Sequence, residues 1–274
     1  MQAATPTRLQ RWQDGWSSGR YSIPGQGFHQ ATVHPYLLAY LDTVVHRIPR
    51  HNARILLPLC GKTVDMIYLA NEQITVIGLE AIPRAIAEFA EIVEEHGGGS
   101  MERVPDGVTC DAGLGHHSWM CSQKSNATTS ITIVEGDALD FELEQAKGIP
   151  MDAVWDRGAL VALRVKDRQA YVEMLSNVLK PGGRILLSVV EHDCKMEMEG
   201  EKNDTATTTT TTCSRIPYGP PFSLTREDVE GLYTPFGVHL LNELVREDKL
   251  ENEPRWKGKG ATIFQEVCYL LEKC

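Results

Sequence analysis

The residue of this sequence best placed to bind a cofactor is a carboxylate at the end of an apolar run. Glu80 closes the run that begins at Ile74, and Gly61 precedes it at the distance, about 20 residues, found in nucleotide-binding βαβ units. A carboxylate in that place accepts hydrogen bonds from both hydroxyls of a ribose. The alternative is a solvated acid at a strand end, which the apolar run before Glu80 disfavours. The spacing therefore predicts a cofactor that contains ribose.

The turn that precedes this unit has only one glycine. It reads Cys60-Gly61-Lys62, so the Gly-x-Gly-x-x-Gly fingerprint that cradles a pyrophosphate is absent. An NAD-dependent oxidoreductase would share the fold and the strand-end acid, but it should show that fingerprint. A cofactor without phosphates is favoured.

Two further polar residues follow apolar runs. Asp137 is placed to accept a hydrogen bond from the exocyclic amine of adenine, although a turn-forming role after Gly136 is an equal alternative. Arg157 stands at the mouth of a later run, where a buried arginine is costly unless it is paired. Its alternative role is a structural ion pair with Asp156 or Asp152, and we favour a place in the active site.

The elements that must position these residues alternate between apolar runs and helical periodicity, which indicates an α/β fold. We predict a doubly wound, mostly parallel seven-stranded sheet whose last two strands form an antiparallel C-terminal edge. The expected helices are 63–71, 82–96, 168–179 and 225–233, the last with Thr225 and Asp228 in capping-box spacing. The expected strands are 54–59, 74–80, 130–135, 152–155, 184–190, 238–245 and 262–271.

The length predicts a single domain over residues 1–274. Two polar stretches, 97–129 and 195–214, break the alternation, and we expect them to be expanded surface loops. His116 and His117 lie in the first of these, with no third ligand at a suitable spacing, so no metal site is predicted.

Charge and composition narrow the function. The formal net charge of −10 disfavours nucleic acid as a partner, because nucleic-acid binding depends on a concentrated basic surface. No run approaches the ~20 apolar residues of a membrane helix, and residues 1–13 lack a signal-peptide core. The seven cysteines are scattered, which indicates reduced thiols. We expect a cytoplasmic monomer that acts on a small molecule.

Six short motifs, in this order, closely resemble those of the thiopurine S-methyltransferase family, and together they span nearly the whole chain. They are Trp12-x-x-x-Trp16-x-x-Gly19, Phe28-His29-Gln30, Leu57-Pro58-Leu59-Cys60-Gly61-Lys62, Val76-Ile77-Gly78-Leu79-Glu80, Trp155-Asp156-Arg157-Gly158-Ala159-Leu160-Val161-Ala162 and Gly219-Pro220-Pro221-Phe222. The resemblance implies a Rossmann-like methyltransferase fold and a metal-independent transfer of methyl from S-adenosyl-L-methionine to the sulfur of a small aromatic or heterocyclic thiol, leaving S-adenosyl-L-homocysteine.

The resemblance also implies roles for individual residues. Residues 1–50 would form a lid and a helix, with Trp12, Trp16 and Phe28 over the cofactor. Leu59 and Gly61 would approach its methionine part, Glu80 its ribose, and Asp137 with Ala138 its adenine. Arg157 would lie between cofactor and acceptor and bind both, as the catalytic residue. Phe28, Pro221 and Arg255 would contact the acceptor.

This sequence departs from the family pattern in places that affect the acceptor more than the cofactor. Residues 21–27 lengthen the lid before Phe28, and Asp137 stands where the vertebrate enzymes have serine. Two alternatives therefore stay open. One is a methyltransferase for halide, thiocyanate, another thiol, or selenium or tellurium compounds. The other is a non-catalytic protein that binds S-adenosylmethionine, which the retained acceptor-side residues disfavour.

Overall fold

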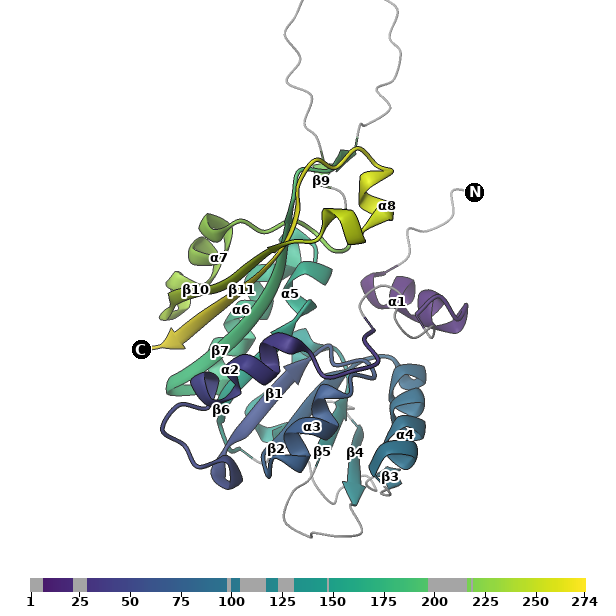
Figure 1. Ribbon diagram of the computed structural model, residues 1–274. Helices are drawn as coiled ribbons and strands as arrows, with labels where there is room; N and C mark the ends of the chain where they lie inside the picture. Colours follow the sequence, from purple (N-terminus) through teal and green to yellow (C-terminus); the bar gives the residue numbers. More distant parts are fainter. Residues whose placement is uncertain are drawn as a thin grey trace, which may run out of the picture.

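The computed structural model describes residues 7–21, 29–97, 100–103, 117–122, 131–146, 148–196, 216–217 and 219–274. Its centre is a nine-stranded sheet in the order β10-β11-β7-β6-β1-β2-β5-β4-β3 (Figure 1). The strands are β1 Arg54–Pro58, β2 Thr75–Glu80, β3 Ser100–Arg103, β4 His117–Ser122, β5 Ile131–Glu135, β6 Met151–Arg157, β7 Leu179–His192, β10 Val238–Asp248 and β11 Phe264–Lys273. A separate two-stranded sheet pairs β8 Lys195–Met196 with β9 Ile216–Pro217.

Seven of the nine strands form the predicted doubly wound sheet. Strands β7, β6, β1, β2 and β5 pair in parallel, whereas β11 and β10 add antiparallel partners beyond β7. Residues 181–183 lie within β7, which begins earlier than the expected strand 184–190; the register with β6 shifts there, and Gly182 has a φ of +74°. The fold class and the antiparallel C-terminal edge are confirmed.

The two faces of the sheet are covered by different helices because side chains alternate along each strand. Ile55 and Leu57 pack with α2, α3 and α4 on one face, while Leu56 packs with α5, α6 and α7 on the other (Figure 1). The helices are α1 Arg8–Ser17, α2 Pro35–Val44, α3 Asp65–Asn71, α4 Pro83–Gly97, α5 Ala159–Ala162, α6 Val165–Val178, α7 Arg226–Tyr233 and α8 Pro254–Lys257. The capping box expected between Thr225 and Asp228 is present at the start of α7.

The expectation that residues 97–129 form a surface loop is wrong in part. Strands β3 and β4 form within 97–129 and extend the sheet, β4 pairing antiparallel with β5. Trp119 of β4 packs against the core, and its indole nitrogen donates a hydrogen bond to Glu135 at 2.9 Å. β3 is only four residues long and is intermediate to exposed along its length, so it carries no run of buried apolar residues. Within 195–214, residues 195–196 form β8; residues 197–215 lie outside the described part.

The order of the strands defines where a ligand binds. From β1 the chain builds β2 and β5 on one side and then crosses to β6 and β7 on the other. Beyond the carboxyl ends of β1 and β6 the connections diverge, which leaves the crevice typical of ligand sites in open α/β sheets. Within the described residues, no helix has the length and apolar character needed to cross a membrane.

Candidate functional site

The turn after β1 has a backbone shape that depends on Gly61. Leu59 and Gly61 both have positive φ values, +48° and +55°, and the Cys60 amide donates to the Leu79 carbonyl at 2.9 Å. A Cβ added to Gly61 would lie 3.4 Å from His29 and 3.7 Å from Trp16. Those distances are ordinary contacts, so the positive φ is the reason that this position favours glycine.

Glu80, at the end of β2, is buried, with 8% of its surface exposed. One carboxylate oxygen accepts from the Gly61 amide at 2.8 Å and the other from the Ile82 amide at 2.9 Å. Because each carboxylate oxygen has two lone pairs, both can still accept from a ribose hydroxyl. The alternative of a solvated strand-end acid is wrong.

Burial raises the pKa of Glu80 to about 7. The hydrogen bonds from backbone amides act to lower this pKa, but their effect is smaller than that of burial. Hydrogen bonds from ribose hydroxyls favour the charged form, so cofactor binding and ionisation of Glu80 should be linked. The free protein is largely protonated at this residue below pH 7 and ionised above it. Cofactor affinity should therefore rise with pH and level off above the pKa.

We expect the affinity for S-adenosylhomocysteine to be roughly tenfold lower at pH 6 than at pH 8 through this residue alone. Titration calorimetry across that range, on the native protein and on Glu80→Gln, isolates the contribution because ionisation of the ligand affects both proteins equally. Parallel pH profiles for the two would contradict the linkage.

Asp137 has a different set of partners from the expected one. Its side chain caps the short 3-10 turn Ala138–Asp140, accepting from the Leu139 amide at 3.0 Å, and its second oxygen pairs with Arg8 of α1. The turn-forming alternative is therefore present, together with an ion pair that the sequence analysis missed. Ala138 is buried in the same turn. Contact of Asp137 or Ala138 with adenine stays a prediction.

Helix α1 lies over the start of α4 (Figure 1). Trp16 is 2% exposed and packs against Ile82 and Ala85, with Trp12 at the edge of the same cluster. The Trp16 ring also meets His29 edge-on at 4.9 Å. The two expected lid tryptophans thus lie together beside the Gly61–Glu80 turn, whereas Phe28 lies outside the described residues.

The Arg8–Asp137 pair joins this helix to the end of β5, and its side chains are only 18% and 20% exposed. Replacing Arg8 with Gln should speed cofactor dissociation about 3- to 10-fold, because a partly buried, charge-assisted contact holds the helix in place. Stopped-flow fluorescence measures the rate. Arg20→Gln is the matched control, since Arg20 is exposed on the same segment. Equal rates in the two variants would contradict a closing role for Arg8.

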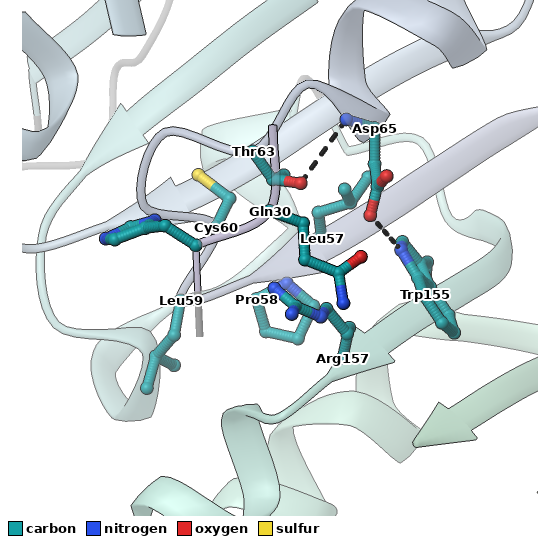
Figure 2. Close-up of a pocket in the computed structure, with 10 residues that line it drawn as sticks. Gln30, Leu57, Pro58, Leu59, Cys60, Thr63, Asp65, Trp155 and Arg157 are labelled. Carbon is teal, nitrogen blue, oxygen red and sulfur yellow. Dashed lines mark hydrogen bonds between the residues drawn. The ribbon is translucent and has the colours of Figure 1, made fainter. Parts of the chain in front are cut away.

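A pocket opens beyond the carboxyl ends of β1 and β6, where the connections after these strands diverge, as the strand order predicts (Figure 2). Figure 2 shows Gln30 and Arg157 pointing toward the space between Pro58 and Trp155. The pocket is lined by His29, Gln30, Leu57, Pro58, Leu59, Cys60, Thr63, Asp65, Trp155 and Arg157. Only Leu59 and Arg157 among these were expected as site residues. His29, Gln30 and Trp155 belong to motifs that the sequence analysis noted without assigning them roles.

Arg157 ends β6 on the wall of this pocket. Both carboxylates proposed as its structural partner bind other groups. Asp156 accepts from the Tyr171 hydroxyl at 2.8 Å and caps α5, while Asp152 pairs with Lys180 at 2.6 Å. Burial lowers the pKa of the guanidinium, and the charges of Asp65 and Glu266 act in the opposite direction. A guanidinium stays protonated in proteins, so the pocket wall carries a cation.

His29 is the second basic side chain of the pocket. Burial, with the positive charges of Lys62 and Arg157, lowers the pKa of His29 to about 4. The imidazole is therefore neutral near pH 7, and it adds no repulsion toward a cationic cofactor. Among the described residues, no group of three potential metal ligands comes together.

The two remaining expected residues lie outside this pocket. The Pro221 carbonyl is 3.0 Å from Nε2 of His192, and the Phe222 amide donates to the Val161 carbonyl at 2.7 Å, so this segment is held between β7 and α5. Arg255 is exposed on α8, its guanidinium 5.7 Å from the centre of the neighbouring Trp256 ring. Contact of Pro221 or Arg255 with an acceptor stays a prediction.

Comparisons with known proteins agree with this architecture. Residues 7–274 match the family thiopurine S-methyltransferase (TPMT). The chain is 32% identical to thiopurine S-methyltransferase of Xanthomonas campestris over 97% of both chains, and 32% identical to that of Legionella pneumophila over 89% of this chain and 87% of the relative. In fold it is similar to magnesium protoporphyrin IX methyltransferase of Synechocystis with bound SAM, with a TM-score of 0.57 at 10% identity, over 99% of this chain and 100% of that one. The chain belongs to the thiopurine S-methyltransferase family.

Proposed function

We propose that this protein transfers the methyl group of S-adenosylmethionine to the sulfur of a small aromatic or heterocyclic thiol. The observation that carries the proposal is the buried Glu80 carboxylate on the Gly61 turn, with the Arg157 cation at the adjoining strand end. Membership of the thiopurine S-methyltransferase family supports both the cofactor and the acceptor atom. Cytoplasmic location and a monomeric state stay predictions from the sequence.

The residues of the turn fit such a cofactor. Glu80 has acceptor capacity for the ribose, Gly61 supplies the positive φ of the turn, and Trp16 approaches Gly61 with Trp12 in the same cluster. When bound, S-adenosylmethionine supplies an activated methyl group on its sulfonium. Because the electrophile needs no further activation, the protein chiefly has to align the acceptor and exclude water.

Arg157 supplies the charge that this reaction needs. A thiol has a pKa near ~8.5, and an aromatic thiol lower, so an anionic fraction exists near neutral pH without a strong base. The guanidinium stabilises that anion electrostatically at the pocket wall. With S-adenosylmethionine held at the Gly61 turn, its sulfonium would supply the methyl group to the acceptor sulfur beside Arg157, and the proton of the thiol would pass to solvent.

A transfer assay with labelled S-adenosylmethionine tests the proposal against its alternatives. The acceptors are a thiopurine, an aliphatic thiol, thiocyanate, iodide and selenite. We expect turnover of the thiopurine to exceed that of the other four. Preferred methylation of thiocyanate, iodide or selenite would replace the proposed acceptor class. Binding of S-adenosylmethionine without transfer to any of them would indicate a non-catalytic binding protein.

A further inference from the structure

A buried carboxylate at the start of α3 lines the pocket. Asp65 is 1% exposed and accepts two hydrogen bonds, from the His34 amide at 2.9 Å and from the indole nitrogen of Trp155 at 2.8 Å. Trp155 and Arg157 are two residues apart on β6 and so share a face of the sheet. Figure 2 shows Asp65, Trp155 and Arg157 around one space. Asp65 and Arg157 therefore line the same pocket, with Trp155 beside both.

A second carboxylate approaches from the neighbouring strands. Glu266 of β11 accepts from the Ser188 hydroxyl at 3.1 Å, and Ser188 is the direct partner of Arg157 in the β6–β7 register. Burial would raise the pKa of Glu266, but hydrogen bonds from His34 and Ser188 outweigh it and leave that pKa below its usual range. Glu266 is therefore an anion near the carboxyl end of β6.

His34 connects the two carboxylates. Its Nδ1 accepts from the Tyr36 amide at 3.2 Å, so the ring proton sits on Nε2, which lies 3.2 Å from Glu266. Its backbone amide bonds Asp65. One residue at the start of α2 thereby ties α3 to β11 across the region where β6 ends.

We propose that Asp65 and Glu266, bridged by His34, are positioning residues that hold the guanidinium of Arg157 at the acceptor side of the pocket. This inference rests on the proposed function and deepens it. A buried guanidinium without oriented anions pays a large desolvation cost, and an arginine that adopts several orientations stabilises a developing anion poorly. The electrostatic contributions agree, because Asp65 and Glu266 both oppose the effect of burial on the pKa of Arg157.

Whether the rate rises or falls in Glu266→Gln shows whether Glu266 acts by holding Arg157 in place or only through its own charge. Replacing Glu266 with Gln removes a negative charge near the pocket, which by Coulomb interaction alone would favour an anionic acceptor and raise the rate. If Glu266 acts by holding Arg157, the rate falls instead. Glu272→Gln is the matched control, since Glu272 lies on the same strand and pairs with Arg184 at 2.7 Å, near the opposite end of β7.

The test measures kcat/KM for a thiopurine in the native protein, Glu266→Gln, Arg157→Gln, the double variant and the control. We expect Glu266→Gln to lower kcat/KM about tenfold, and the double variant to be no slower than Arg157→Gln, because residues that act through one group are non-additive. The dissociation constant for S-adenosylhomocysteine should stay within about twofold of native, so that the loss lies on the acceptor side. A Glu266→Gln rate equal to that of the control, or losses that multiply in the double variant, would overturn the inference.

A spectroscopic readout keeps this test independent of turnover. The Nε–H resonance of Arg157, assigned from its absence in Arg157→Lys, should be sharp in the native protein and broadened in Glu266→Gln but not in Glu272→Gln. Ser188→Ala removes one hydrogen-bond donor to Glu266 and should broaden the Arg157 resonance less than Glu266→Gln does. This variant replaces Glu266→Gln in the test if Glu266→Gln does not fold. An unchanged resonance would refute positioning. Absence of thiol methylation by the native protein would refute the proposed function, and the resonance measurement on Arg157 would still test positioning.

Discussion

Replacing Glu80 with Gln is expected to weaken the binding of S-adenosylmethionine about 10- to 150-fold, because hydrogen bonds to a charged group contribute about 1.5 to 3 kcal/mol and each ~1.4 kcal/mol is tenfold. Glutamine keeps the size and one acceptor oxygen but loses the charge. It also keeps an acceptor for only one of the two amides that hold the turn, those of Gly61 and Ile82.

Titration calorimetry measures this loss, and Glu135→Gln is the matched control. Glu135 ends the neighbouring strand in direct register with Glu80, and its side chain accepts from Trp119 instead. The control should bind as the native protein does. Native affinity in Glu80→Gln would remove Glu80 from the cofactor site and weaken the ribose argument as a whole.

Replacing Arg157 with Gln is expected to lower kcat/KM for a thiol acceptor about 10²- to 10³-fold, the cost typical of removing one preorganised donor to a reacting anion. The turn that holds the ribose lies on β1 and β2, so the affinity for S-adenosylhomocysteine should fall much less than kcat/KM. The measurement is a steady-state assay with the acceptor varied at saturating cofactor.

Arg184→Gln controls for the loss of a partly buried arginine. Arg184 lies near the amino-terminal end of the parallel sheet, where it pairs with Glu272 and donates to the Thr43 carbonyl at 2.8 Å. That variant should lose stability and keep its kcat/KM. Comparable rates in the native protein and Arg157→Gln would show that the cation plays no part in transfer.

Most of the sheet and one half of the site follow from local sequence patterns. Runs such as Ile74–Glu80 are long enough and apolar enough to be recognised as buried strands, and parallel strands place their carboxyl ends on one edge. Gly61, Glu80 and Arg157 each stand at or just after the carboxyl end of such a strand, so the sequence predicts that all three lie at that edge. The structure adds that Gly61 and Glu80 are buried and that Arg157 is partly buried on the pocket wall.

The missed features are pairings between residues far apart in the chain. Arg8 meets Asp137 across 129 positions, and His34 meets Glu266 across 232. No local spacing encodes such contacts, because they depend on how α1 and β11 pack on the finished sheet. Asp65 was missed for a related reason: an acid in the first turn of a helix is favourable on the surface as well, so its type and place carry no sign of burial.

The claim that this protein methylates sulfur is tested most directly with 6-mercaptopurine as the acceptor, because that molecule has one sulfur and several ring nitrogens. The measurement identifies which of these atoms receives the methyl group. The product formed from S-adenosylmethionine labelled with carbon-13 in its methyl group identifies the atom by its carbon chemical shift. We predict a single S-methyl product, formed by the native protein and lost in Arg157→Gln. A product methylated on nitrogen, or no labelled product from a protein that binds the cofactor, would contradict the account.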